Sequence, residues 1–199
     1  PPPLLRSSAA SDVYKRQKHF VSGRNLFDSY PVNSAEIILG AGCFWGVERV
    51  FWQTDGVWVT HASYCGGHRP NPNYEQVCTG VSGHAETVNV IFDTQKISLE
   101  EILKIFWECH DPTQGMRQGN DVGSQYRSAI FCKDQAQLDI AIKSKNKFEA
   151  ILQQSNFSSI TTEISIQEVS YPAEDYHQQY LAKNPDGYCG IKGTGCAYL

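Results

Sequence analysis

The stretch "EIILGAGCFWGVERVFWQ", residues 36–53, predicts the strand-to-helix turn around which the fold is organised. Residues 36–39 form a short apolar run typical of a strand, and helical spacing follows it. The residues that recur at this spacing are Val47, Val50 and Phe51. Cys43 lies at the turn between two glycines and directly before two aromatic residues. The most reactive common side chain therefore stands where a strand is expected to give way to a helix.

Further strand and helix patterns alternate along the chain. We expect strands over residues 56–64, 85–93, 126–132 and 161–169, and helices over 98–109, 134–152 and 173–183. This order, with one directly adjacent strand pair, predicts an α+β fold, a two-layer α/β sandwich with a ferredoxin-like core. Long loops are expected at residues 65–84 and 111–125. The glycine-rich C-terminal tail, residues 184–199, is expected to be mobile.

Two of the expected helices carry N-terminal caps. Ser98 and Glu101 form a capping box, and Asp134 and Gln137 form a cap pair. Inward-facing apolar positions are expected in the second of these helices at Leu138, Ile142, Phe148, Ile151 and Leu152.

The bulk composition indicates an ordinary globular domain. A chain of 199 residues suits one domain, which we place at residues 35–199. The formal net charge is −4, and the sequence has no long runs of charged residues. It therefore lacks the basic patch that would indicate binding to nucleic acid or to an anionic membrane. Apolar stretches stay below the ~18 residues that span a bilayer. We expect a monomer, with the cytoplasm as the default compartment.

The first residues need separate treatment. The segment "DVYKRQ", residues 12–17, resembles the translation of an adapter used in sequencing libraries. We therefore interpret residues 1–17 as a sequencing scar and exclude them from the fold. A transit-peptide remnant is the alternative. Residues 18–34 are predicted to be a polar, turn-rich and unstructured lead-in.

The cysteine count is odd, which does not suit a small disulfide scaffold. The seven cysteines are Cys43, Cys65, Cys78, Cys109, Cys132, Cys189 and Cys196. Cys78, Cys109 and Cys132 have apolar neighbours, and we expect them to be inert thiols. The chain has no CxxC pair, which disfavours thioredoxin-like and zinc-ribbon interpretations.

Cys43 is the first candidate nucleophile. At a helix N-terminus a thiol faces unpaired N–H groups and the positive end of the dipole, and both stabilise a thiolate. Phe44 and Trp45 would line an apolar pocket beside the sulfur. A buried cysteine in a tight packing turn explains this stretch equally well.

Cys189 and Cys196 lie among glycines in the polar tail. Two thiols on a mobile arm can exchange with a distant thiol. Metal binding or a static disulfide are the alternatives. Zinc is disfavoured because the nearest upstream ligand, His177, belongs to another element.

Glu86 is a candidate general acid. It follows a glycine-rich loop within an apolar strand, and burial would raise its pKa. An outward-facing strand glutamate is the simpler interpretation of this residue alone. Tyr74 and Tyr126 could donate hydrogen bonds to a polar oxygen, or could merely anchor their loops.

Taken together, these motifs resemble those of the A-type methionine sulfoxide reductases, the peptide-methionine (S)-S-oxide reductases. The resemblance covers nearly all of residues 35–196 in family order, with one departure at Thr87. The motifs are "GCFWGVE", "GGHRPNPNYEQVCTG", "SGHAETV", "HDPTQ", "GNDVGSQYRS", "YHQQYL" and "NPDGYCGIKG".

The resemblance implies a thiol-dependent mechanism and a role for each candidate. Phe44 and Trp45 would hold the substrate methyl, and Glu86 would protonate the sulfoxide oxygen. Tyr74 and Tyr126 would hydrogen-bond that oxygen, and Asp121 would help to orient the site. Cys43 would become a sulfenic acid, and Cys189 would condense with it to form a disulfide. Cys196 would then exchange with Cys189, which moves the disulfide to the tail, where thioredoxin would reduce it. The implied activity is repair of oxidised methionine, free or in proteins, without metal, flavin or nicotinamide.

Other interpretations of the cysteines and histidines remain. A cysteine-rich binding or zinc-structural domain would not turn over, and a cysteine hydrolase would act without reductant. The sequence "CHD" imitates a catalytic cluster, but adjacent residues rarely face one another. We expect His110 and Asp111 to be structural, His68 to be exposed or packed in a turn, and His177 to pack near the site.

Overall fold

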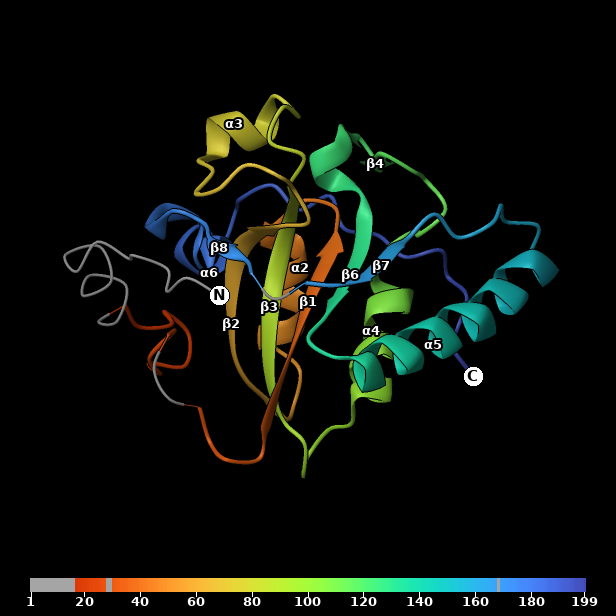
Figure 1. Ribbon diagram of the computed structural model, residues 1–199, viewed down its shortest axis with the longest axis horizontal. Coiled ribbons are helices and arrows are strands. Elements are labelled where there is room, and N and C mark those ends of the chain that lie inside the picture. The colour runs from red at the N-terminus through yellow and green to blue at the C-terminus, as the bar shows by residue number, and fades with distance from the viewer. Residues whose placement is uncertain (1–16, 28–29, 168) are drawn as a thin grey trace.

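The computed structural model describes residues 17–27, 30–167 and 169–199. Its centre is a six-stranded sheet with the order β7-β6-β1-β3-β2-β8 (Figure 1). The strands are β1 (Ser34–Ala41), β2 (Val57–Cys65), β3 (Ala85–Asp93), β6 (Ser128–Cys132), β7 (Glu163–Ile166) and β8 (Tyr171–Pro172). Neighbouring strands pair antiparallel except β6 and β7, which are parallel.

The helices are α2 (Phe44–Trp52), α3 (Tyr74–Cys78), α4 (Leu99–Cys109), α5 (Gln135–Gln154) and α6 (Tyr180–Lys183), with 3-10 turns η1 (Ser124–Tyr126) and η2 (Asp175–His177). A small hairpin joins β4 (Arg117–Gln118) to β5 (Asp121–Val122). Among the described residues, no helix is both long and apolar enough to cross a membrane.

The central strands confirm the predicted ferredoxin-like core. Helix α2 connects β1 to β2, α4 connects β3 to β6, and the strands lie in the order β6-β1-β3-β2. Each helix therefore crosses from one strand to another that is not its neighbour. Both crossovers pack on the same sheet face, together with α5.

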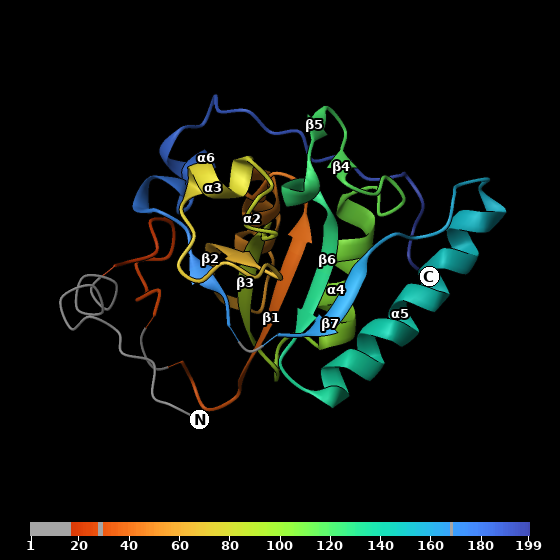
Figure 2. The same ribbon diagram turned by 45° about the horizontal axis from the view of Figure 1, so that its top comes forward.

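The main apolar core lies between the sheet and these helices. Phe44 and Phe51 of α2, Phe106 and Trp107 of α4 and Phe148 of α5 are all buried there. On the opposite face the strands carry two small apolar clusters and, between them, polar side chains that include Ser63, Thr87 and Asn89. Asn89 donates to Ser170 Oγ at 3.0 Å, so the link between β7 and β8 lies across this face (Figure 2).

The predicted caps are present. Ser98 accepts from the Glu101 amide and the Glu101 carboxylate accepts from the Ser98 amide, which completes the capping box. Asp134 accepts from the Gln137 amide at the start of α5. Ile142 was wrongly predicted to face inward; its side chain is 44% exposed.

Three predictions about irregular segments change. Residues 173–183 are not one helix, because Gln179 has a left-handed backbone that separates η2 from α6. The loops at 65–84 and 111–125 contain α3 and the β4–β5 hairpin. The lead-in is not unstructured where it is described: Leu26 is fully buried against Val59 and Ile91. The scar assigned to residues 1–17 lies outside the described residues apart from residue 17.

The packing of Trp107 between α4 and α5 should contribute strongly to the stability of the fold. Trp107 is fully buried and its indole N–H donates to Ser144 Oγ at 3.0 Å. Trp107→Ala should lower the free energy of unfolding by about 3–5 kcal/mol, measured by chemical denaturation, because it leaves a large cavity. Lys104→Ala, on the exposed side of α4, should change it by less than about 0.5 kcal/mol. Equal effects of the two changes would contradict this account of the core.

Candidate active site

Cys43 lies at the N-cap of α2, directly after the end of β1. The turn depends on Gly42, whose φ of +97° is rarely adopted by other residues. A Cβ at this position would also come within 2.8 Å of Gln118 in β4. Glycine therefore lets the chain turn tightly beneath the hairpin, and it places the sulfur at the head of the helix.

The resting state of Cys43 differs from the sequence-based expectation. Burial raises the pKa of the thiol well above its usual value, and Glu86, when it is ionised, raises it further. A hydrogen bond from the Trp45 amide lowers the pKa, but by less than burial raises it. The helix terminus does favour a thiolate, yet desolvation outweighs it. The raised pKa favours the thiol in the resting site, whereas position at a helix N-terminus alone favours the thiolate.

Glu86 projects from β3 toward the same helix terminus. The Phe44 amide donates to Glu86 Oε2 at 3.0 Å, so one backbone bond ties the carboxyl to the residue after Cys43. The side chain is 1% exposed, and burial raises its pKa to about 8. The carboxyl is therefore protonated at neutral pH and can donate a proton. This geometry excludes the outward-facing alternative.

Aromatic rings gather beside Cys43. The ring of His177 lies 4.9 Å from Phe44 and 4.4 Å from Tyr74, centroid to centroid. The Trp45 indole donates to His177 Nδ1 at 3.0 Å and stacks on Tyr180 at 3.9 Å. Burial lowers the pKa of His177 to about 4, so this imidazole is neutral. The rings form an apolar wall that one partly buried hydrogen bond fixes in place.

The predicted polar residues come from three separate segments. Tyr74 begins α3, Tyr126 ends η1 and Asp121 begins β5. Burial raises the pKa of both tyrosines, which therefore remain hydrogen-bond donors, and the charge of Glu86 raises both further. The charge of Asp121 raises the pKa of Cys43 and of Glu86. The structure thus brings these residues into one electrostatic neighbourhood.

The tail returns to this neighbourhood at Cys189. A Cβ added to Gly46, one helical turn after Cys43, would lie 3.1 Å from Cys189 Sγ. The Arg49 guanidinium, a further turn on, donates to the same sulfur at 2.9 Å. Tyr188 donates to Asp121 Oδ2 at 3.3 Å. Cys189 therefore rests on α2 in the same region as Cys43.

The rest of the tail has no helix or strand, but it packs on the domain (Figure 2). Gly193 approaches the Glu108 carbonyl so closely that a Cβ would lie 2.0 Å from the oxygen. The Tyr198 amide donates to Glu108 Oε1 at 2.7 Å. Cys196 is half-buried against the main core. Glycine in the tail thus permits close contact with the backbone of α4. A glycine-rich composition alone does not distinguish this role from mobility.

Two acids were missed by the sequence analysis, the half-buried Glu174 and the fully buried Glu48. Glu174 accepts from Tyr64 Oη at 2.7 Å and from the Tyr74 amide at 2.9 Å, which fixes the start of α3. Glu48 accepts from the Gln179 amide at 2.8 Å and holds the break before α6. An acidic residue on the apolar face of a predicted helix was the available signal for Glu48.

The other candidates are structural in this fold. His110 contacts the Phe106 carbonyl and Ser128 Oγ, each at 2.7 Å, and so joins α4 to β6. Asp111 accepts from Thr113 within its own loop. His68 is exposed. In the described part of the chain, His, Cys, Asp and Glu do not gather in groups of three that could hold a metal ion.

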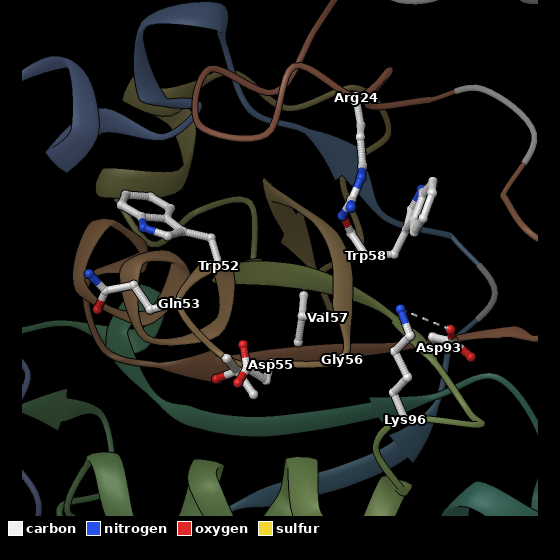
Figure 3. Close-up of a pocket in the computed structure, with 10 residues that line it drawn as sticks. Arg24, Trp52, Gln53, Asp55, Gly56, Val57, Trp58, Asp93 and Lys96 are labelled. Carbon is white, nitrogen blue, oxygen red and sulfur yellow. Dashed lines mark hydrogen bonds and ion pairs between the residues drawn. The ribbon is translucent and has the colours of Figure 1, made fainter.

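A polar cavity of about 250 Å³ lies elsewhere, at the C-terminal end of α2 (Figure 3). Its lining includes the ion pair of Lys96 and Asp93, and the Arg24 guanidinium stacks over Trp58 at 3.9 Å. Cys43 lies at the opposite end of the same helix. Lys96 is paired with Asp93, Arg24 is engaged by Trp58, and the lining residues do not include Cys43.

Comparison with known proteins gives a consistent family. The family described as Peptide methionine sulfoxide reductase matches residues 35–196. Peptide methionine sulfoxide reductase MsrA of Ectopseudomonas mendocina is 55% identical over 179 residues, which cover 90% of this chain and 82% of that protein.

Solved structures agree with this similarity. Methionine sulfoxide reductase A of Corynebacterium diphtheriae has a TM-score of 0.82 at 40% identity, covering 91% of this chain and 88% of that one. Reduced Mxr1 of Saccharomyces cerevisiae has a TM-score of 0.75 at 33% identity, covering 82% and 92%. Mxr1 has also been solved in complex with Trx2.

The raised pKa of Glu86 makes stability depend on pH. The folded carboxyl keeps its proton up to about pH 8, whereas the unfolded carboxyl releases it near 4.5. Between these values folding takes up a proton, so stability falls as pH rises. The glutamine of Glu86→Gln does not titrate. The free energy of unfolding of this variant, relative to that of wild type, should therefore rise by roughly 2–4 kcal/mol as the pH is raised from about 5 to about 8.

Chemical denaturation across this pH range measures the gain. Glu100→Gln, an exposed change on α4, should follow the wild-type curve. If Glu86→Gln also follows that curve, the carboxyl is not held neutral by burial.

Proposed function

The chain belongs to the peptide methionine sulfoxide reductase family, and we propose that it reduces methionine sulfoxide with Cys43 as nucleophile and Glu86 as general acid. The observation that carries these roles is the hydrogen bond between the Phe44 amide and a buried, protonated Glu86. It holds a proton donor at the residue after the sulfur, in a site walled by aromatic rings. Oxidised methionine in proteins and the free amino acid are both within the proposed substrate class.

The aromatic wall suits the apolar part of this substrate. Methionine sulfoxide has a small methyl group on the same sulfur as a strongly polar oxygen. Phe44 and Trp45 would hold the methyl, while Tyr74, Tyr126 and Glu86 would hydrogen-bond the oxygen. Because the Trp45 indole is fixed on His177, this wall is formed before substrate binds. The S epimer is the proposed substrate because the chain resembles the A-type reductases; binding of methyl and oxygen on fixed sides is consistent with selection of a single epimer.

Proton transfer from Glu86 to the oxygen makes the substrate sulfur electrophilic. Cys43 loses its thiol proton as its sulfur takes the oxygen, and methionine leaves. Substrate sulfur is reduced by two electrons, and Cys43 is oxidised to a sulfenic acid. A second proton, released by the thiol, restores the acid form of Glu86. The high resting pKa of Cys43 makes this proton movement part of the reaction.

Cys189 supports the next step because its sulfur already rests on α2, against Gly46 and Arg49, on the helix that begins at the nucleophile. Its thiol would attack the sulfenic sulfur of Cys43, forming a disulfide and releasing water. Cys196 would exchange with Cys189, which returns Cys43 to a thiol and leaves a disulfide in the tail. Thioredoxin is the proposed dithiol reductant, in keeping with the yeast complex of Mxr1 with Trx2. Cys196 is half-buried against the main core, so we expect the tail to rearrange when the two tail sulfurs exchange.

Cys43→Ser should abolish reduction of a methionine sulfoxide peptide, because a hydroxyl cannot take the oxygen under these conditions. The assay is methionine formation driven by dithiothreitol, followed by mass spectrometry. Cys109→Ser is the matched control, since a hydroxyl there can still donate to the Phe106 carbonyl. Activity that survives in Cys43→Ser would remove this sulfur from the mechanism.

Cys189→Ser should separate chemistry from recycling. Without reductant the variant should release about one methionine per enzyme, because Cys43 can still be oxidised once. It should then fail to turn over with thioredoxin, since the sulfenic acid is not converted to a disulfide. Wild-type turnover with thioredoxin in this variant would show that another group resolves Cys43.

A further inference from the structure

The side chain of Arg49 is hydrogen-bonded to a cysteine sulfur and not to a carboxylate. Its guanidinium donates to Cys189 Sγ at 2.9 Å. The residue is half-buried on α2, two turns after Cys43, with Gly46 between them. Ion pairs in the described residues join Lys96 to Asp93, Lys104 to Glu108, Arg127 to Glu163 and Lys133 to Glu36. Arg49 takes part in none of these ion pairs of the described residues. Its guanidinium instead donates to the cysteine sulfur.

We propose that Arg49 is a catalytic residue of the disulfide-forming step, in which it holds the Cys189 sulfur beside Cys43 and stabilises the negative charge that develops on it. The inference rests on the proposed function, in which Cys189 resolves the sulfenic acid of Cys43. It adds a positively charged group that contacts one of the two reacting sulfurs.

The chemistry of the step explains why a cation is useful there. The Cys189 thiol loses its proton, its sulfur bonds to Cys43 Sγ, and the sulfenic S–O bond breaks. The released hydroxyl combines with a proton to give water, so the step needs no outside oxidant or reductant. Negative charge builds on Cys189 as its proton leaves. A guanidinium remains charged at all relevant pH values, so it can stabilise that charge throughout the step.

The helix geometry aligns these groups. Residues 43, 46 and 49 are spaced by three, so Gly46 neighbours both Cys43 and Arg49 on the surface of α2. Gly46 leaves room for Cys189, because a Cβ there would meet the sulfur at 3.1 Å and Ile191 at 3.0 Å. The sulfur thus rests over a glycine, held by Arg49 from one side. The charge of Cys189 also influences the pKa of Cys43, as expected for neighbours.

A purely structural role for Arg49 is the competing explanation. It lies in the last turn of α2, where a positive charge favours the helix dipole. That role predicts a loss of stability and leaves the disulfide step unchanged. The catalytic role predicts the opposite pattern, so the two are separated by measuring each chemical step.

The experiment uses Arg49→Met and Arg49→Gln in the reduced full-length chain. Each is mixed with excess methionine sulfoxide peptide, without reductant, and quenched at successive times. Methionine is quantified by mass spectrometry, the sulfenic acid of Cys43 is trapped with dimedone, and the Cys43–Cys189 disulfide is mapped in peptides. Lys143→Met, an exposed change on α5, is the control for loss of a surface cation.

The first methionine should form at a rate within about twofold of wild type in both Arg49 variants, since Arg49 does not contact the substrate. Disulfide formation should slow by about 10- to 100-fold, as expected for the loss of one charged hydrogen bond. Dimedone-labelled Cys43 should accumulate in these variants, and Lys143→Met should match wild type.

A wild-type rate of disulfide formation in either folded Arg49 variant would overturn the role of Arg49. The proposed function would then still stand, because methionine release by wild type tests it separately. If wild type itself releases no methionine, the proposed function fails and not only this inference.

Discussion

The site depends on one hydrogen bond between a backbone amide at the start of α2 and a buried carboxyl on β3. The Phe44 amide belongs to the unpaired N–H groups of the helix, and Glu86 supplies its acceptor. The antiparallel pairing of β1 with β3 brings the two elements together, with Leu39 opposite Val88. Because this region is buried, Glu86 remains protonated at neutral pH. The same bond therefore caps the helix and holds the proton donor next to Cys43.

The core of the fold could be predicted because it follows local patterns. Apolar periodicity identified the main strands and helices, and Ser98 and Asp134 were read correctly as caps. Segments set by tertiary contacts could not be predicted in this way. The expected helix over residues 173–183 breaks at Gln179, because Glu48 from α2 accepts two of its hydrogen bonds. Sequence around Gln179 carries no sign of that distant acceptor.

The site residues were predicted mainly from the family resemblance, and the structure adds their physical state. Position at a helix N-terminus indicates a thiolate at Cys43, but the degree of burial, which reverses that conclusion, depends on the whole fold. Glycines in the tail indicate mobility from composition alone. In the structure Gly193 instead allows close backbone contact with Glu108. Arg49 reads as an ordinary surface cation until the tail is folded back onto α2.

A neutral resting cysteine has a chemical advantage in this site. Thiolates are the form that peroxides oxidise, so a permanently ionised Cys43 would be consumed without substrate. Burial keeps both Cys43 and Glu86 protonated, which leaves the pair inert until a sulfoxide oxygen arrives as a proton acceptor. In the mechanism that we propose, proton transfer from Glu86 to that oxygen would create a carboxylate beside the thiol. The base that accepts the thiol proton would then form only when substrate is bound, so that activation of the nucleophile is coupled to binding.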